Sequence, residues 1–159
     1  MEDVSQTALD MIKRFEGFSG EKYYCPAGKL TIGYGHVIAP EEYFPDSISQ
    51  QEAESILKQD VNAILGAFLR LVKVETTQNQ QDALLSLAYN IGIKAFEKST
   101  LLRLLNAGDA EGAARQFDRW VYIKGVKSNG LANRRATEKA WFLGEETKEN
   151  QGFQRFMTD

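Results

Sequence analysis

The chain has 159 residues, of which 43% are hydrophobic and 26% are charged, proportions ordinary for a globular protein with a sizeable core. A formal net charge of −3 and a sequence pI near 5.3 give no electrostatic reason to bind nucleic acid or an anionic membrane. One cysteine excludes an intramolecular disulfide, and the single histidine has no neighbouring ligand cluster that would indicate a metal site.

The first predicted helix, residues 5–16, ends on a carboxylate. Leu9, Ile12 and Glu16 recur at i, i+3 and i+7, so Glu16 continues an inward-facing apolar stripe. Gly17 follows directly, where a C-cap glycine belongs. Partial burial and the negative end of the helix dipole both penalise the charged form of a carboxylate placed there. Glu16 is therefore a candidate general acid.

A β-hairpin is predicted to follow this helix. Residues 22–25 and 30–37 are expected to form its two strands, and the proline and glycine between them are typical of a turn. The hairpin would bring Thr31 back toward Cys25 near the turn. Both side chains could then face one cleft together with Glu16.

The longest predicted helix opens with a capping box at Ser49 and Glu52 and continues for about twenty residues. Asp60 interrupts its apolar stripe, and an inward-facing carboxylate needs a partner. Two interpretations are open: the carboxylate pairs with His36, or it points to solvent at the edge of the apolar face. If the pair forms, its role is structural, joining the hairpin strand to the long helix.

The rest of the chain reads as helical. Helices are expected over residues 79–91, 100–107, 109–120 and 131–143, and a surface helix is expected from about residue 145. Asn90 lies in the final turn of a helix that is apolar almost all round, where its amide either caps backbone groups or is offered to a sugar. Arg134 and Arg135 fall in the first turn of a later helix, a poor place for cations. Either both are solvated, or at least one has a better partner.

The stretch FEGFSGEKYYCPAGKLTIGYGH carries Glu16, Cys25 and Thr31 at the spacing Glu-x8-Cys-x5-Thr, followed by IGYGH. This pattern resembles the phage-type lysozymes of glycoside hydrolase family 24, whose usual triad is Glu, Asp or Cys, and Thr. Later segments resemble those of the family and come in family order: SQQEAESILKQDV, QQDALLSLAYNIG, STLLRLLNAGD, QFDRWV and GLANRRATEKAWF. The resemblance therefore covers nearly the whole chain.

The resemblance and the element pattern together predict an α+β, mainly α, lysozyme-like fold in one domain, residues 1–159. A small β-hairpin lobe would comprise about residues 17–48. A larger helical lobe would comprise residues 1–16 and 49–159, with the long helix joining the two. The substrate cleft is expected between the lobes, with Glu16 at its floor.

The resemblance implies a bacteriolytic endolysin, a lysozyme-type glycosidase that cleaves the β-1,4 bond between N-acetylmuramic acid and N-acetylglucosamine in bacterial peptidoglycan, without a cofactor. Glu16 would protonate the leaving oxygen. Thr31 would hold the attacking water, and Cys25, in the place where the family often has aspartate, is a base, a water-orienting group or a bystander. Arg134 would approach the acid carboxylate across the cleft. The sugar sites, by resemblance, are lined by Val37, Tyr89, Asn90 and Ser99.

Two alternatives share this fold. A non-catalytic module could bind peptidoglycan or a protein through the cleft, although the presence of all three triad residues speaks against it. A lytic transglycosylase would need only an acid/base and the muramic 6-hydroxyl, and the missing aspartate is compatible with that reaction. No run of about eighteen apolar residues is present, so neither a transmembrane helix nor a signal-peptide core is expected. We expect a monomer that remains in the host cytoplasm until a separate membrane pore releases it to the wall.

Overall fold

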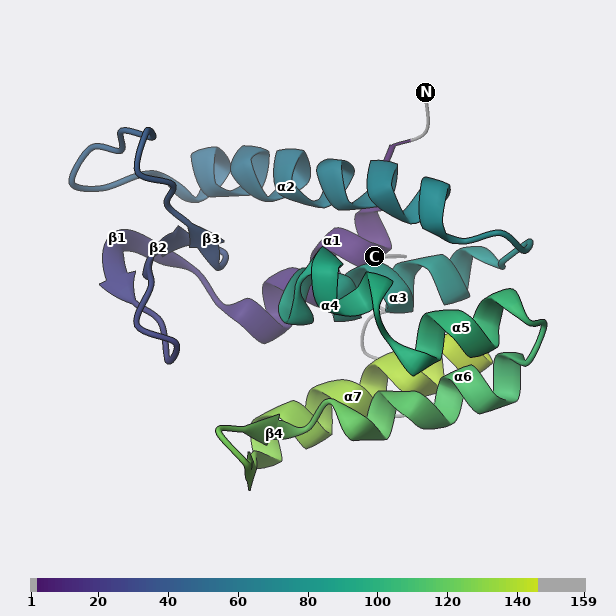
Figure 1. Cartoon of the computed structure of the whole chain (residues 1–159). Coiled ribbons are helices and arrows are strands. Elements are labelled where there is room, and N and C mark those ends of the chain that lie inside the picture. The colour runs from purple at the N-terminus through teal and green to yellow at the C-terminus, as the bar shows by residue number, and fades with distance from the viewer. Residues whose placement is uncertain (1–2, 146–159) are drawn as a thin grey trace. The chain divides into compact units, whose positions relative to one another are not determined.

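A computed structural model describes residues 3–145 (Figure 1). The chain divides into two compact units, Met1–Ala63 and Ile64–Asp159. The described part is mainly helical with two small antiparallel sheets, which confirms the α+β, mainly α class. The first helix falls in the first unit, together with the larger sheet. The lobe boundaries and the cleft expected from the sequence stay predictions.

The first unit begins with helix α1, Gln6–Glu16. The hydroxyl of Ser5 caps it by accepting the backbone N–H of Ala8 at 3.1 Å. Gly17 ends it with a φ of 72°, a conformation that a residue with a side chain rarely adopts. The helix boundaries expected from the sequence are therefore confirmed, and Glu16 is the last helical residue.

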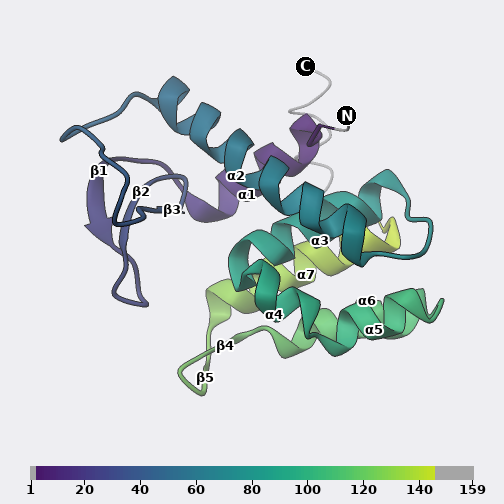
Figure 2. The ribbon, with the colours of Figure 1, turned by 45° about the horizontal axis from the view of Figure 1, so that its top comes forward.

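A three-stranded antiparallel sheet follows α1, in the order β1-β2-β3 (Figure 2). Its strands are β1 (Ser19–Tyr24), β2 (Leu30–Gly33) and β3 (His36–Val37). The single strand expected over residues 30–37 is wrong, because the chain reverses between β2 and β3. Gly33 and Gly35 have φ values of 71° and 82°, so the glycines of the IGYGH motif make a turn that an alternating pattern does not reveal.

Helix α2 runs from Gln50 to Leu71 and continues from the first unit into the second. Its capping box is confirmed: the Ser49 hydroxyl accepts the Glu52 N–H at 3.0 Å, and the Glu52 carboxylate accepts the Ser49 N–H at 3.2 Å. No helix in the described residues is long and apolar enough to cross a membrane.

The second unit is built on α3 and α7, which pack along each other. Every residue of α3 from 81 to 88 is buried, as its apolar sequence predicts. The elements are α3 (Gln78–Ile91), α4 (Ile93–Glu97), α5 (Thr100–Asn106), α6 (Ala110–Gln116), the 3₁₀ turn η1 (Phe117–Arg119), β4 (Tyr122–Ile123), β5 (Val126–Lys127) and α7 (Asn129–Leu143).

Three features of this unit differ from the sequence-based expectation. Helix α4 is too short to show a helical period. The segment between the helices expected over residues 109–120 and 131–143 contains the β4–β5 hairpin, whose turn has positive φ at Lys124 (49°) and Gly125 (82°). Helix α7 begins at Asn129 with Ser128 as its cap, so Arg134 and Arg135 lie beyond its first turn. The surface helix expected from about residue 145 lies outside the described residues.

Lys124→Asn is expected to stabilise the chain by about 0.5–1 kcal/mol, because a two-residue hairpin turn with two positive φ values favours Asn-Gly over Lys-Gly. Chemical denaturation of parent and variant measures the difference in the free energy of unfolding. Lys127→Asn, on strand β5, removes the same charge where the backbone is extended, and should give no gain. An equal gain from both substitutions would show that charge, not backbone conformation, is responsible.

Candidate functional site

All three candidate catalytic residues lie in the first unit. Glu16 ends α1, Cys25 lies in the turn after β1, and Thr31 is on β2, paired with Tyr23 of β1. Two backbone hydrogen bonds close the turn. The Cys25 N–H donates to the Lys29 carbonyl at 2.9 Å, and the Gly28 N–H donates to the Cys25 carbonyl at 2.7 Å. The hairpin therefore returns Thr31 toward Cys25, as the sequence predicts.

The half-buried carboxylate of Glu16 lies directly against the backbone of Gly35. A Cβ atom built on Gly35 would be 2.7 Å from Glu16 Oε1 and 3.2 Å from its Cδ, closer than real side chains approach. Gly35 therefore serves two purposes: it adopts a positive φ, and it leaves room for the acid. The sequence showed the glycine, but only the structure shows that it faces Glu16.

Tyr23 is within electrostatic range of both the acid and the thiol, which the sequence analysis missed. Burial raises the pKa of its phenol, and the negative charges of Glu16 and Cys25 raise it further. Since both charges act on one phenol, Tyr23 is in electrostatic reach of both groups. The structure thus couples Cys25 to Thr31 and places Glu16 and Cys25 within electrostatic range of one phenol, while their catalytic roles stay predictions.

The half-buried thiol of Cys25 sits among hydrogen-bond donors of its own turn. A hydrogen bond from the backbone of Lys29 is the main cause that lowers its pKa, and partial desolvation opposes it. The backbone of Ala27, the hydroxyl of Thr31 and the charge of Lys29 lower the pKa further. These donors favour the thiolate, the form of cysteine that can accept a proton.

Thr31 is only 1% exposed, and its hydroxyl is shared between two acceptors. It donates to the Lys29 carbonyl at 2.9 Å and also reaches the Cys25 thiol. A hydroxyl has one proton, so these two donations are alternatives, and its lone pairs stay available to accept. Thr31 is therefore coupled directly to Cys25.

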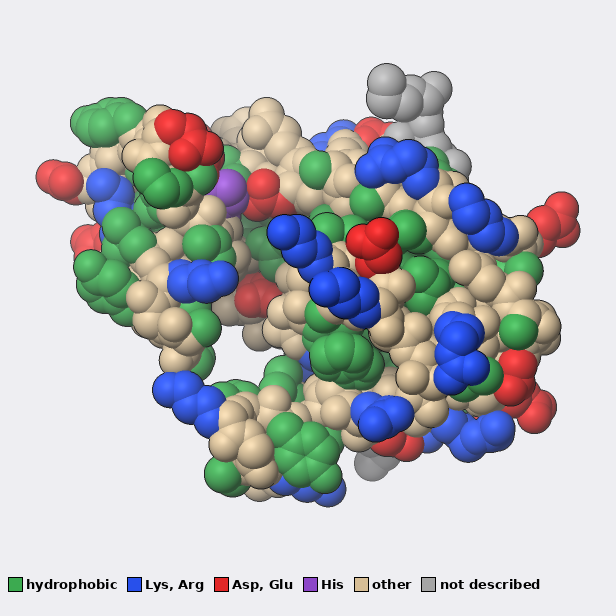
Figure 3. Space-filling view, in the orientation of Figure 1, with side chains coloured by type: hydrophobic (Ala, Val, Ile, Leu, Met, Phe, Trp, Pro, Cys, Tyr) green, Lys and Arg blue, Asp and Glu red, His purple; other side chains and the backbone are tan. Residues whose placement is uncertain are grey.

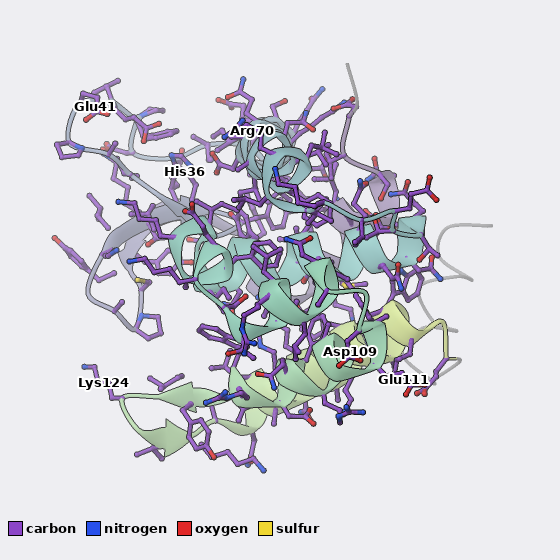
Figure 4. The ribbon with its side chains drawn as sticks, turned by 45° about the vertical axis from the view of Figure 1, so that its right-hand side comes forward. His36, Glu41, Arg70, Asp109, Glu111 and Lys124 are labelled. Atoms are coloured by element: carbon purple, nitrogen blue, oxygen red, sulfur yellow. The ribbon has the colours of Figure 1, made fainter. Side chains whose placement is uncertain are left out.

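His36, which is labelled in Figure 4, contacts two carboxylates at once. Its Nδ1 is 2.7 Å from Asp60 Oδ2, and its Nε2 is 3.0 Å from Glu42 Oε1. The pairing of His36 with Asp60 is confirmed, and the interpretation that Asp60 only points to solvent is wrong. Glu42 was missed by sequence reasoning; its carboxylate also accepts the Ala39 N–H at 2.8 Å.

Both ring nitrogens of His36 face acceptors, so the cluster suits the doubly protonated imidazolium. Asp60 is the main cause that raises the pKa of His36, burial opposes it, and Glu42 adds to it. The pKa of Glu42 is lowered mainly by the hydrogen bond from the Ala39 N–H and further by His36. The cluster joins β3, the following loop and α2 within the first unit.

The residues expected in the sugar sites are distributed over both units. Val37 lies on β3 and is exposed, and the face drawn in Figure 3 shows hydrophobic side chains over this sheet. Tyr89 is half-buried and Asn90 is exposed, both near the end of α3. The Ser99 hydroxyl caps α5: it accepts the Leu102 N–H at 3.1 Å and donates to a backbone carbonyl at 2.7 Å. Contact of these residues with sugar stays a prediction.

Arg134 and Arg135 are 4% and 1% exposed, so the interpretation of two solvated arginines is wrong. Arg134 Nε donates to Glu138 Oε2 at 3.1 Å, and its terminal nitrogen donates to the Ser86 carbonyl at 3.1 Å. Its approach to Glu16 stays a prediction.

Comparison with known proteins identifies the relatives of the chain. The family model described as phage lysozyme matches residues 13–138. The endolysin of Acyrthosiphon pisum secondary endosymbiont phage 1 is 42% identical over 87% of this chain and 97% of its own length. The endolysin of Bacillus phage B103 is 41% identical over 92% of this chain, which spans 56% of that longer relative. The muramidase domain of SpmX from Asticaccaulis excentricus has a similar structure, with a TM-score of 0.80 and 35% identity over 90% of this chain and 99% of that domain.

His36→Asn is expected to destabilise the first unit, and the loss should depend on pH. The folded pKa of His36 is raised above its unfolded value of about 6.5, so the contribution of the cation is complete below that pH and is lost as pH rises through the folded pKa. Hydrogen bonds to charged groups suggest a loss of about 1–3 kcal/mol. Asp60→Asn should cost a similar amount, and the double variant little more. Urea denaturation across pH measures these differences, and additive losses would contradict the coupling.

Alkylation of Cys25 should show a thiolate that forms at lower pH than in a free cysteine. The backbone and hydroxyl donors that lower its pKa cause this shift. The rate of modification by iodoacetamide, measured across pH, gives the midpoint. Thr31→Val removes one donor and should move the midpoint upward, toward the free thiol. A parent midpoint at or above that of free cysteine would contradict the hydrogen-bonded turn.

Proposed function

Because the chain belongs to the phage lysozyme family, we propose that it uses Glu16, Cys25 and Thr31 to cleave the β-1,4 bond between N-acetylmuramic acid and N-acetylglucosamine. Membership confirms the resemblance read from the sequence, the lysozyme-like fold and the class of the protein, a bacteriolytic peptidoglycan hydrolase and glycosidase. The comparisons give no support to a lytic transglycosylase or a non-catalytic module. The observations that support the residue assignment are that Glu16 and Cys25 both act electrostatically on Tyr23 and that Thr31 hydrogen-bonds to Cys25.

Glu16 is the proposed general acid. Glycoside hydrolysis requires a carboxylic acid that protonates the leaving oxygen while positive charge develops on the sugar ring. The half-buried position at the end of α1, with the backbone of Gly35 against the carboxylate, supports the assignment because it restricts where the proton is presented. The proposed approach of Arg134 to this carboxylate belongs to the same assignment.

Cys25 is the proposed base. Its hydrogen-bonded turn lowers the pKa of the thiol, which favours a thiolate able to orient or deprotonate a water molecule. Thr31, which hydrogen-bonds to the same sulfur, would hold that water molecule through its hydroxyl. Attack on the face opposite Glu16 would invert the anomeric carbon. The proposed sugar contacts are Val37, Tyr89, Asn90 and Ser99, of which Ser99 already donates its hydroxyl proton to the Phe96 carbonyl.

We further propose that the protein waits in the host cytoplasm, as a monomer, until a pore formed by another protein releases it to the wall. Some relatives are named endolysins and others SAR-endolysins, so the names support a role in lysis and leave the release route to experiment. Detection of the native protein in the periplasm of intact cells that make no pore-forming partner would contradict the proposal. Analytical ultracentrifugation of the purified chain gives its mass in solution, and a mass above that of one chain would contradict the proposed monomer.

Glu16→Gln should lower turnover about 100-fold or more, because general acid assistance is typically worth 10²–10⁴-fold, and should leave thermal stability no lower than in the parent. Purified sacculi serve as substrate, with turbidity and released fragments as readouts. Glu41→Gln, an exposed residue with the same charge change, is the matched control and should be fully active. Mass analysis should find hydrated reducing ends; anhydro ends would indicate transglycosylation, and normal activity of Glu16→Gln would remove the acid assignment.

Cys25→Asp should retain activity and Cys25→Ala should lose most of it, because aspartate can replace a thiolate base and alanine cannot. Steady-state turnover on sacculi compares the two variants with the parent, and the stereochemistry at the new anomeric centre, followed by NMR, should show inversion. Full activity of Cys25→Ala would make the thiol a bystander and leave Thr31 to hold the water.

A further inference from the structure

The second unit contains a buried carboxylate whose partners extend to the surface. Glu138 on α7 is 0% exposed and accepts from Arg134, from Arg135 and from the hydroxyl of Ser86 on α3. Arg135, itself 1% exposed, also donates from Nε to the Trp120 carbonyl at 2.8 Å. A buried carboxylate and a buried guanidinium are stable only with such complete pairing. The side chain of Arg135 is thereby held along its length.

The remaining arm of Arg135 leaves this core and donates to Oδ1 of Asn90, near the end of α3. Asn90 is exposed, so one guanidinium joins a fully buried anion to a surface amide. A guanidinium has donors and no acceptor, so the amide atom that faces it must be the oxygen. The Nδ2 group of Asn90 therefore points away from Arg135, and within residues 3–145 it donates to no acceptor.

We propose that Arg135, anchored by Glu138, is a positioning residue that fixes the amide of Asn90 so that both Nδ2 protons are offered to an acceptor oxygen of the glycan. This inference rests on the proposed function. Without the guanidinium the amide could rotate and present its oxygen to the substrate, which would repel an acceptor. The N-acetyl carbonyl fits the exposed donors, because it is a strong neutral acceptor that each sugar of the glycan carries. Glycan whose N-acetyl groups have been removed carries ammonium groups instead and should be disfavoured at this position.

Asn90→Asp removes the outward donors of the amide and leaves its bond to Arg135 in place. A carboxylate keeps its bond to Arg135 and replaces the outward N–H₂ group by an oxygen. We expect kcat/KM on N-acetylated glycan to fall about tenfold, mainly through KM, with an unchanged or raised melting temperature. Discrimination against de-N-acetylated glycan should also decrease, because the new oxygen accepts from ammonium groups. Asn133→Asp, an exposed residue of α7 with the same charge change, should alter neither value.

A double-variant cycle tests whether Arg135 acts through Asn90. Arg135→Lys keeps the charge beside Glu138 but cannot also reach the amide. We expect it to raise KM in the parent background and to leave KM unchanged in the Asn90→Ala background, while the loss of melting temperature appears in both. An equal rise of KM in both backgrounds would assign Arg135 a purely structural role and overturn the proposal.

NMR provides a readout that does not depend on the stability of an Arg135 variant. In ¹⁵N-labelled Glu16→Gln protein, which binds without cleaving, comparison with Asn90→Ala identifies the Nδ2H₂ pair. Titration with the N-acetylglucosaminyl–N-acetylmuramyl disaccharide should shift this pair, and absence of a shift at saturation would overturn the inference. If Asn90→Asp is fully active while Glu16→Gln is inactive, the positioning inference fails and the proposed function stands. An active Glu16→Gln variant would instead refute the general acid.

Discussion

The buried carboxylate of Glu138 is the constraint on which the second unit depends. A negative charge with no exposed surface is tolerated only when donors surround it, and here two guanidinium groups and a hydroxyl do so. Both guanidinium groups come from α7 itself and the Ser86 hydroxyl comes from α3, so the cluster also bonds the two central helices to each other. The packing of α3 buries its residues 81 to 88, and the bonds of Ser86 to Glu138 and Arg134 add a specific polar contact to that packing.

The first unit also depends on a few specific contacts of charged side chains. Its organising contact is the approach of the Gly35 backbone to the Glu16 carboxylate, which places the tight turn of the sheet against the end of α1. His36 then extends this arrangement to α2 through Asp60, and Glu42 closes the loop between them. The candidate acid is thus held by backbone on one side, while a hydrogen-bonded cluster ties the neighbouring strand to the long helix.

Sequence reasoning succeeded where local chemistry decides the outcome. The caps at Gly17 and Ser49 and the apolar sequence of α3 are local features, and each is found in the structure. The turn within IGYGH and the second carboxylate on His36 were not foreseen, and a better partner for at least one of Arg134 and Arg135 was foreseen without the identity of Glu138. The first two depend on the sign of a backbone angle or on a partner outside the element, neither of which a hydrophobic period encodes.

The β4–β5 hairpin has a consequence for behaviour at high concentration. All six of its residues are exposed, among them the apolar Tyr122, Ile123 and Val126, and each strand leaves one edge unpaired within the described part of the chain. Such an edge is a template for pairing between molecules, and lysines are the usual means of preventing it. Lys124 and Lys127 place positive charge on this hairpin, which disfavours such pairing between molecules. A better turn residue at position 124 would relax the backbone and also remove part of the charge that keeps one hairpin from adding to another.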